Sequence, residues 1–486
     1  MTDADRAAAP LICGAFDLGA GPAAAARRPP HKRAARRATR RPFALAPNRL
    51  QQWCSGSGQY GVCSLRHAAP SRQPSVMLAS RGSHCRPYWL TWTLCLVIIV
   101  ACESAAFPDS LRLLVIIVAC ESAAFPDSLR LTSCNARWRR RPGLMSSSRW
   151  PRARRAPALF SSDPQANPLW HASNHVLLPY CSSDMWTGTR ALRASNTTFA
   201  FAGRLIVRFV INELLQLGLS GRLLLVGSSA GGTGVMLHAD AARRSLRSHG
   251  VRVAAIADSG WFLDRPPRAR RAPSADNIAR LGHTLWQGSP PASCVREYRD
   301  KPWLCYFGYR LYPHIRTPLF VFQYLFDSAQ LTAEGVRAPR TRAQWDAVHE
   351  TGSAIRASLK SVRSTFAPAC IAHGALARPE WLAINVSGVS LPRAISCWER
   401  RFSNGSRRER ARCAPRRLIE RCSWPQCNGS CPRLRDPRTG EEVALAALLQ
   451  SFGLDVRGAA AAMGLDARAL SRMSRAELLP LLAPHT

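Results

Sequence analysis

The chain has 486 residues, 47% of them hydrophobic, so it can bury a sizeable core in one large domain or in two or three small ones. Its formal net charge of +37 comes mainly from arginine and favours an anionic partner such as nucleic acid, an anionic polysaccharide or a membrane surface. An integral membrane protein is not expected. The uncharged apolar run 88–102 has 15 residues, fewer than the roughly 20 that a spanning helix needs.

The N-terminal part of the chain carries little periodic pattern. Residues 1–76 are rich in Ala, Arg, Pro and Ser, which predicts disorder. From Met77, a basic stretch, the apolar run and Ser104-Ala105-Ala106 follow in the order of a secretory signal, although a buried strand or helix is the alternative. Residues 96–113 recur without a mismatch as 114–131. Solenoid repeats diverge, so two perfect copies indicate a recent duplication or a gene-model error.

From about residue 141, the sequence has the alternating pattern of an α/β fold. Buried-type strands are expected at 174–180, 222–226, 251–257 and 318–326, and helices at 199–219, 231–248 and 344–362. Such alternation predicts an α/β-hydrolase-like, mostly parallel sheet with helices on both faces. We therefore expect a disordered, signal-like and duplicated region at 1–140 and a hydrolase domain at 141–486.

A nucleophile elbow is expected where the strand at 222–226 meets the next helix. Gly227-Ser228-Ser229-Ala230-Gly231 matches Gly-x-Ser-x-Gly, whose small residues allow a tight, strained turn with Ser229 exposed at its apex. The following helix would direct its positive N-terminal end at this serine. The amide of Ala230 would supply one oxyanion donor. No Gly-Gly pair precedes Ser229 to supply a second.

A serine nucleophile requires a histidine base, which follows it in the chain order of α/β hydrolases. His349, His373 and His485 are the candidates. His349 falls in a predicted helix and His485 at the chain end. His373 is preferred, because it lies between Cys370, expected to form a disulfide, and Gly374. A structural histidine is the alternative interpretation.

The acid that orients the base is expected at the carboxyl end of a strand, where such folds place catalytic groups. Asp258 and Asp327 both follow predicted strands. Asp327 is favoured because it comes later, immediately before the loop that leads towards His373. Each could instead be an ordinary helix cap.

Cysteines and glycosylation sequons point to an oxidising compartment. Five of the 17 cysteines lie between 397 and 431, without the paired spacing of zinc knuckles. Disulfides in a secreted, extracellular protein are therefore preferred over zinc, and no metal or cofactor is expected. Four Asn-x-Ser/Thr sequons lie in the same half of the chain: Asn196, Asn385, Asn404 and Asn428.

A cationic loop is expected inside the cysteine-rich part. It contains Arg400, Arg401, Arg407, Arg408, Arg410, Arg412, Arg416 and Arg417. Nucleic acid is not supported as its partner, because no aromatic-interleaved basic segment or helix-turn-helix pattern accompanies it. A solvated basic loop without a partner is the simpler alternative.

Several motifs in order resemble the palmitoleoyl-protein carboxylesterases of the pectin acetylesterase family. They include GSSAGGTGVMLHAD (227–240), ADSGWFLD (257–264), CYFGYRLYP (305–313), FDSAQLT (326–332) and FAPACIAH (366–373). The resemblance runs from about Gly143 to the C-terminus, roughly 70% of the chain. It implies Ser229 as nucleophile, Asp327 as acid and His373 as base. It also implies an acyl pocket lined by Phe262, Ile278, Tyr306, Phe307 and Ala333, for which plain core packing is the alternative.

The resemblance further implies a secreted enzyme that removes palmitoleate from a serine of Wnt proteins and so opposes Wnt signalling. It implies heparan sulfate on glypicans as the partner of the basic loop. Two departures stand out. The family's Gly-Gly-Trp-Tyr-Cys segment, a source of oxyanion amides, is replaced by the duplication, and a cysteine pair is replaced by Arg268, Arg270 and Arg271. A catalytically impaired glycan- or Wnt-binding homologue without an oxyanion hole is therefore the alternative.

Overall fold

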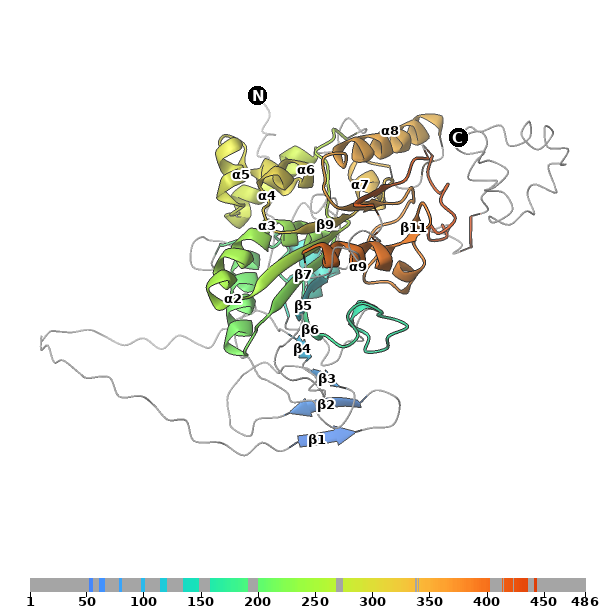
Figure 1. Ribbon diagram of the computed structural model, residues 1–486. Coiled ribbons are helices and arrows are strands. Elements are labelled where there is room, and N and C mark those ends of the chain that lie inside the picture. Colours follow the sequence, from blue (N-terminus) through green and yellow to red (C-terminus); the bar gives the residue numbers. More distant parts are fainter. Residues whose placement is uncertain are drawn as a thin grey trace, which may run out of the picture.

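A computed structural model gives the fold of the chain (Figure 1). It describes residues 134–147, 158–190, 200–267, 274–336, 339, 341–402, 413, 415–422, 424–435 and 441–443, and the backbone of five strands before residue 120. Within these residues, none of the helices combines the length and the apolarity needed to cross a bilayer.

One eight-stranded sheet organises the molecule. Its strand order is β13-β10-β9-β8-β7-β5-β6-β4, and every neighbouring pair is parallel except β4 with β6. The bounds are β4 Ile98–Val100, β5 Leu114–Ala119, β6 Asn174–Pro179, β7 Arg222–Ser228, β8 Arg252–Asp258, β9 Leu319–Phe322, β10 Thr365–Ala367 and β13 Arg417–Ile419. The predicted mostly parallel α/β sheet is confirmed.

Both copies of the repeated segment contribute strands to this sheet. The second copy supplies β5, which lies between β6 and β7, and the first copy supplies β4 at the edge. A continuous run of Leu, Val and Ile is the pattern of a strand buried in a parallel sheet, which is the place that the second copy takes. The sheet thus takes strands from upstream of the boundary expected at residue 140.

A small separate sheet lies further towards the N-terminus. It consists of the antiparallel strands β1 Gln52–Ser55, β2 Gly61–Leu65 and β3 Leu78–Ser80. β1 and β2 lie within residues 1–76, for which the sequence predicts disorder, and that expectation stays a prediction for the rest of the segment. Both are short runs without charge in an otherwise arginine-rich segment.

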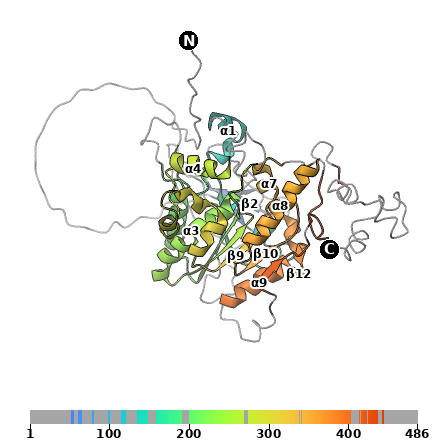
Figure 2. The same ribbon diagram turned by 90° about the horizontal axis from the view of Figure 1, so that it is seen from above.

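Helices cover both faces of the large sheet, and alternate strand residues point to each of them. Leu223 and Leu225 of β7 pack in one apolar cluster with α2, α3, α4 and α8, whereas Leu224 and Val226 pack in a second cluster with α9. Figure 2 shows α3 and α9 on either side of β9 and β10. The helices are α1 Cys134–Arg140, α2 Gly203–Gln216, α3 Ala230–Leu246, α4 Ala275–Trp286, α5 Ala292–Glu297, α6 Gly308–Leu311, α7 Ser328–Ala333, α8 Arg342–Ser358 and α9 Leu391–Phe402.

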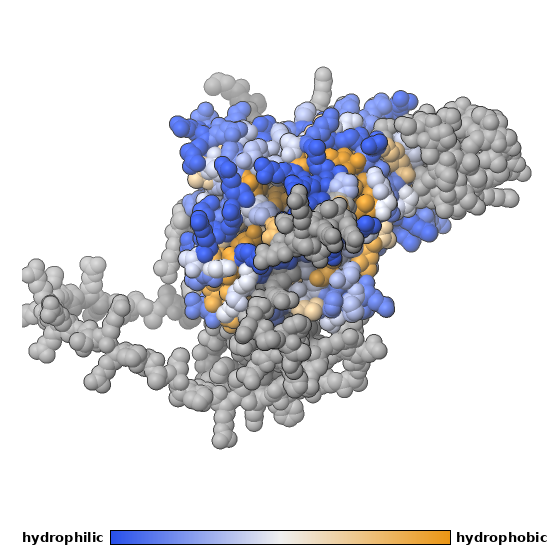
Figure 3. All heavy atoms as spheres, in the orientation of Figure 1, coloured by the Kyte–Doolittle hydropathy of each residue, from blue (hydrophilic) through white to orange (hydrophobic). Residues whose placement is uncertain are grey.

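The surface follows from this layering. In the orientation of Figure 1, hydrophilic side chains cover the region of α4 to α6 and α8, and apolar atoms show between them towards the middle of the described part (Figure 3). A last two-stranded ribbon, β11 Asn385–Val386 with β12 Val389–Ser390, precedes α9.

Disulfides link the C-terminal part of the fold, as expected. Cys370 bonds to Cys431, Cys422 to Cys427, and Cys294 to Cys305, whereas Cys397 and Cys413 are free thiols. The Cys370–Cys431 bond joins residues 61 positions apart, and Cys370 lies three residues before His373. It therefore anchors the loop that contains this histidine.

The two longer-range disulfides should differ in their contribution to stability. Because a cross-link restricts the unfolded chain more when it closes a longer loop, replacing Cys370 and Cys431 by alanine should lower the free energy of unfolding by about 4 kcal/mol, against about 3 kcal/mol for the Cys294 and Cys305 pair. Equilibrium denaturation of the two double variants measures this. A larger loss from the Cys294 and Cys305 pair, whose loop spans 11 residues, would contradict the prediction.

Candidate active site

Ser229 lies at the carboxyl edge of the sheet, on a sharp turn between β7 and α3. Its φ is 58° and its ψ is −122°, a backbone conformation that non-glycine residues rarely adopt. Small residues make the turn possible. A Cβ at Gly227 would overlap the carbonyl of Gly231, and one at Gly232 would lie 2.7 Å from the carbonyl oxygen of Asp258. The expected elbow is therefore formed.

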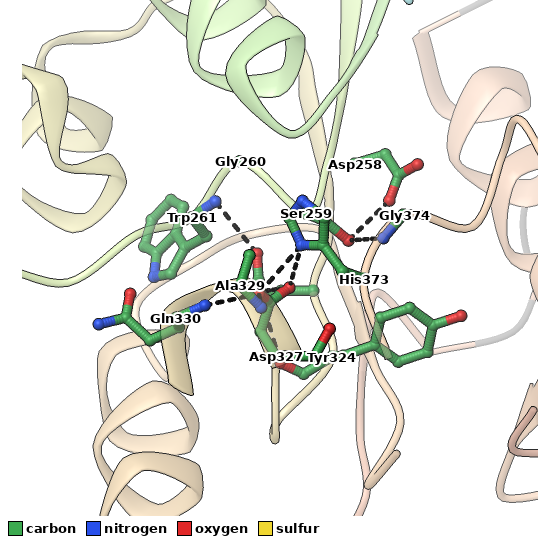
Figure 4. A network of polar contacts seen from close by, with 12 residues as sticks. Asp258, Ser259, Gly260, Trp261, Tyr324, Asp327, Ala329, Gln330, His373 and Gly374 are labelled. Atoms are coloured by element: carbon green, nitrogen blue, oxygen red, sulfur yellow. Dashed lines mark hydrogen bonds and ion pairs between the residues drawn. The ribbon is translucent and has the colours of Figure 1, made fainter. Parts of the chain in front are cut away.

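His373 and Asp327 meet at the same edge of the sheet, although 46 residues separate them in sequence. His373 Nδ1 donates to the Asp327 carboxylate, at 2.8 Å from Oδ2 and 3.0 Å from Oδ1. The carboxylate is fully buried. It also accepts hydrogen bonds from the backbone amides of Ala329 and Gln330 and from Gln323 Nε2, at 2.9 to 3.0 Å (Figure 4). Asp327 is thus held in one orientation towards the imidazole.

The position of Asp327 differs in detail from the expected one. The preceding strand, β9, ends at Phe322 rather than at 326, and Asp327 is the N-cap residue of α7. Its side chain satisfies the free amides at the start of that helix. Asp327 therefore combines the capping role, considered as an alternative, with its contact to His373.

The electrostatic surroundings raise the pKa of His373. Burial by itself lowers the pKa of His373, but the adjacent Asp327 carboxylate raises it, Asp258 raises it further and Arg378 lowers it. The balance leaves the pKa of His373 above its ordinary value of 6.5. An imidazole whose Nδ1 is fixed by a carboxylate can accept a proton at Nε2 and release it again.

Two buried polar atoms at this edge have no hydrogen-bond partner among the residues that the structure describes: Ser229 Oγ and His373 Nε2. Buried polar groups are usually satisfied, so an unpaired one calls for an explanation. These two are the atoms that would exchange a proton if Ser229 acted as a nucleophile and His373 as its base. Hydrogen bonds of this kind are often long or absent before substrate binds.

The other candidate acids and bases take different positions. His349 lies in α8 and makes an edge contact with the ring of Phe326. The carboxylate of Asp258 is fully buried, and it accepts from the amides of Ala375 and Leu376 and from Ser259 Oγ rather than from His373. His485 lies outside the described residues.

The predicted pocket residues surround the base only in part. The ring of Phe262 lies 6.2 Å from that of His373, centroid to centroid. Ile278, Tyr306 and Phe307 are buried with Phe262 in one apolar cluster, and Ala333 is half-buried at the end of α7. This clustering is compatible both with an acyl pocket and with core packing, so the pocket stays a prediction.

The sequon residues and the basic residues are partly described. The Asn428 Nδ2 donates to the carbonyl of Asn385 and to Glu420 Oε2, both at 2.6 Å. A glycan attached to Nδ2 would leave one N–H, so glycosylation of Asn428 would break one of these bonds. The remaining predicted positions Asn196, Asn404, Arg407, Arg408, Arg410 and Arg412 lie outside the described residues.

Sequence reasoning missed the polar residues that support the site. Gln323 connects two of its parts, since Nε2 donates to Asp327 and Oε1 accepts from the amide of Trp261. Ser259 also takes part, as its hydroxyl accepts from the amide of Gly374. Their positions in the sequence could have indicated this role, because both are polar residues that directly follow buried strands at the functional edge.

Comparison with known proteins gives one consistent answer. The sequence profile of the Pectinacetylesterase family matches residues 127–432, more than half of the chain. The chain is 41% identical to the palmitoleoyl-protein carboxylesterase NOTUM of Mus musculus over 69% of its own length and 70% of that protein, and 34% identical to that of Drosophila melanogaster over 72% and 79%. The solved structure of the Wnt deacylase Notum from Drosophila is similar, with a TM-score of 0.61 and 45% identity over 66% of this chain and 91% of that chain. These matches confirm the resemblance inferred from the motifs.

The titration of His373 tests the described electrostatics. The Asp327 carboxylate stabilises the protonated imidazole and so raises the pKa of His373. Asp327→Asn should therefore lower the pKa of His373 relative to the wild type. In the wild type, the raised pKa contributes stability that is complete below pH 6.5 and is lost as the pH rises through the folded-state value. Histidine NMR titration measures the shift, with His373→Gln to assign the signal. An unchanged pKa in Asp327→Asn would refute this account.

Proposed function

The chain belongs to the pectinacetylesterase family, and from this premise we propose that it is a serine carboxylesterase that removes palmitoleate from a serine of Wnt proteins and so opposes Wnt signalling. The names of the mouse and Drosophila relatives support this activity. The observation that carries it is geometric. A buried Asp327–His373 pair lies at the same sheet edge as the strained elbow that contains Ser229.

In the proposed reaction, Ser229 Oγ attacks the acyl carbonyl while His373 Nε2 takes its proton. Asp327 holds the Nδ1 proton and stabilises the imidazolium that forms. The Wnt serine oxygen leaves with the proton from Nε2, and palmitoleate remains as an ester of Ser229. His373 then activates water, which releases palmitoleate as the free acid and restores the serine.

The oxyanion formed in each step requires hydrogen-bond donors. We assign one to the amide of Ala230, at the N-terminus of α3. A second donor is expected after β5. This strand runs parallel to β7, with Val118 in register with Gly227, so that its carboxyl end lies at the edge where Ser229 is found. The residues that follow β5, from 120 to 133, lie outside the described ones. The names of the relatives do not favour the catalytically impaired alternative.

An apolar pocket would hold the acyl chain. We propose that its lining includes Phe262, Ile278, Tyr306, Phe307 and Ala333, of which Phe262 lies beside the base. Burying each CH₂ of the chain would contribute about 0.8 kcal/mol. A long acyl group would therefore bind mainly through such contacts, whereas Ser229 and His373 perform the chemistry.

We also propose an extracellular setting and a sulfated glycan partner. Three described disulfides fit an oxidising compartment. Arg363, Arg416 and Arg417 line a surface hollow of about 540 Å³ at the edge of β13. Arg400 and Arg401 lie nearby in sequence, in the last turn of α9. These positive charges would attract the sulfate groups of heparan sulfate on glypicans.

Replacing the nucleophile tests the enzymatic proposal. Ser229→Ala should reduce hydrolysis of a p-nitrophenyl ester and of a palmitoleoylated Wnt peptide by about 10⁴-fold or more, because no covalent intermediate can form. Ser361→Ala, at an exposed serine, serves as the control and should retain full activity. Equal turnover by wild type and Ser229→Ala would rule out the proposed mechanism.

Heparin chromatography tests the glycan proposal. Arg416→Ser with Arg417→Ser should elute at lower salt than the wild type, because two charges at the hollow are lost and such contacts are screened by salt. Arg247→Ser with Arg252→Ser is the control, because it removes the same charge from exposed positions. Arg252 begins β8, which is three strands away from β13 in the sheet. If both pairs shift elution equally, only net charge matters and the specific site is refuted.

A further inference from the structure

We infer that Asp258, with Ser259, is a positioning residue that sets the placement of Ser229 relative to His373. The inference rests on the proposed function, for which neither residue performs a chemical step. Asp258 lies in no proton path, yet its carboxylate is fully buried and contacts both halves of the site. Burying a carboxylate is costly unless hydrogen bonds compensate it, so these contacts require an explanation.

The first half of the site is attached to Asp258 through the nucleophile elbow. Ser228 and Asp258 are the last residues of the neighbouring parallel strands β7 and β8, and they are paired in register. The amide of Ser229 donates to the carbonyl oxygen of Asp258 at 2.8 Å. The side chain of Ser228 acts on the Asp258 carboxylate as well, since it lowers the pKa of that carboxyl group. Asp258 thus holds the residue before the nucleophile by strand pairing and the nucleophile itself by a hydrogen bond from its amide.

The second half is attached through the loop that follows His373. The amides of Ala375 and Leu376 donate to Asp258 Oδ2 at 3.0 and 3.1 Å. Ser259 connects the same segments, because its hydroxyl donates to Asp258 Oδ1 at 2.9 Å and accepts from the amide of Gly374 at 3.0 Å (Figure 4). Three consecutive backbone amides directly after the base are therefore fixed to the end of β8.

The approach of the two halves leaves little room. Gly374 has a φ of +71°, and a Cβ added to it would lie 3.0 Å from the hydroxyl of Ser228. The elbow and the histidine loop are thus in near contact beside the carboxylate that bonds to both. Moving this carboxylate would change the separation of Ser229 Oγ and His373 Nε2, the two unpaired atoms.

A carboxylate suits this place better than any other side chain. It accepts from the Ser259 hydroxyl and from two backbone amides. Burial raises the pKa of Asp258, and these hydrogen bonds oppose that shift by stabilising the charged form. An ionised carboxylate only accepts, with about four lone-pair sites, whereas an asparagine amide offers one accepting oxygen and two donors. Asp258→Asn keeps the shape of the side chain, but with its oxygen in the place of Oδ2 it puts an NH₂ donor where Oδ1 accepts from the Ser259 hydroxyl.

The charge of Asp258 gives a second readout that a purely structural role would lack. The charged groups that act on His373 are Asp327 and Asp258, which raise its pKa, and Arg378, which lowers it. Removing the Asp258 charge should therefore move the acid limb of the pH–rate profile to lower pH. A residue that only stabilised the fold would leave that limb in place.

The test compares Asp258→Asn with Asp184→Asn. Asp184 is a matched control, because it is also a fully buried carboxylate that accepts from a serine hydroxyl, Ser182, and from the backbone amides of Trp186, Gly188 and Gly203. It makes no hydrogen bond to the elbow or the histidine loop among those described. Thermal melting first gives the folded fraction of each variant at the assay temperature, and rates are compared per folded protein.

Fluorophosphonate labelling of Ser229 is the main readout, since it needs the nucleophile–base pair but no Wnt substrate. Asp258→Asn should slow labelling and kcat by about 10- to 100-fold, with KM within about two-fold, because a misplacement of about 1 Å can cost 10² in rate. Asp184→Asn should label like the wild type. Equal slowing in both variants, or wild-type labelling by Asp258→Asn, would overturn the inference.

If Asp258→Asn does not fold, Ser259→Ala decides the question. It retains the carboxylate and removes only the link between Asp258 and Gly374, and it should slow labelling by about 10-fold. Labelling at the wild-type rate would refute the positioning role. Wild-type protein that labels normally but leaves a palmitoleoylated peptide intact would refute the proposed substrate and not this inference.

Discussion

The parallel register of β7, β8 and β9 is the constraint on which the rest of the site depends. Because parallel strands end at one edge, residues far apart in sequence meet there: Ser229 after β7, Asp258 at the end of β8 and Asp327 shortly after β9. Apolar side chains on both faces fix this register, since a shift of one residue would exchange the two clusters. The geometry of the site is thus a consequence of core packing.

Strain and burial are concentrated at this edge. Ser229 and Ser259 both have positive φ values, and both follow the last residue of a strand. Two buried carboxylates, Asp258 and Asp327, lie within one network but have different partners. One holds the imidazole directly, whereas the other fixes the backbone on either side of it. Because each carboxylate accepts several hydrogen bonds, the strained backbone at this edge is held in place before substrate binds.

Much of this arrangement could be predicted from sequence, because its signals are local. The elbow glycines, the apolar strands and the order of serine, aspartate and histidine are all readable within short windows. The support given by Gln323 and Asp258 could not be read, since the Asp258 contacts to Ala375 and Leu376 span 117 and 118 residues. The use of the repeat as β5 was also missed, because strand placement depends on partners rather than on the segment itself.

The acyl-enzyme is the most direct test of the account. Wild-type protein is mixed with a palmitoleoylated Wnt peptide, quenched in acid within the first turnovers and digested for mass spectrometry. The account predicts one palmitoleoyl group on the peptide that contains Ser229, and none in Ser229→Ala. Release of palmitoleate without such an adduct, or an adduct on another residue, would contradict it.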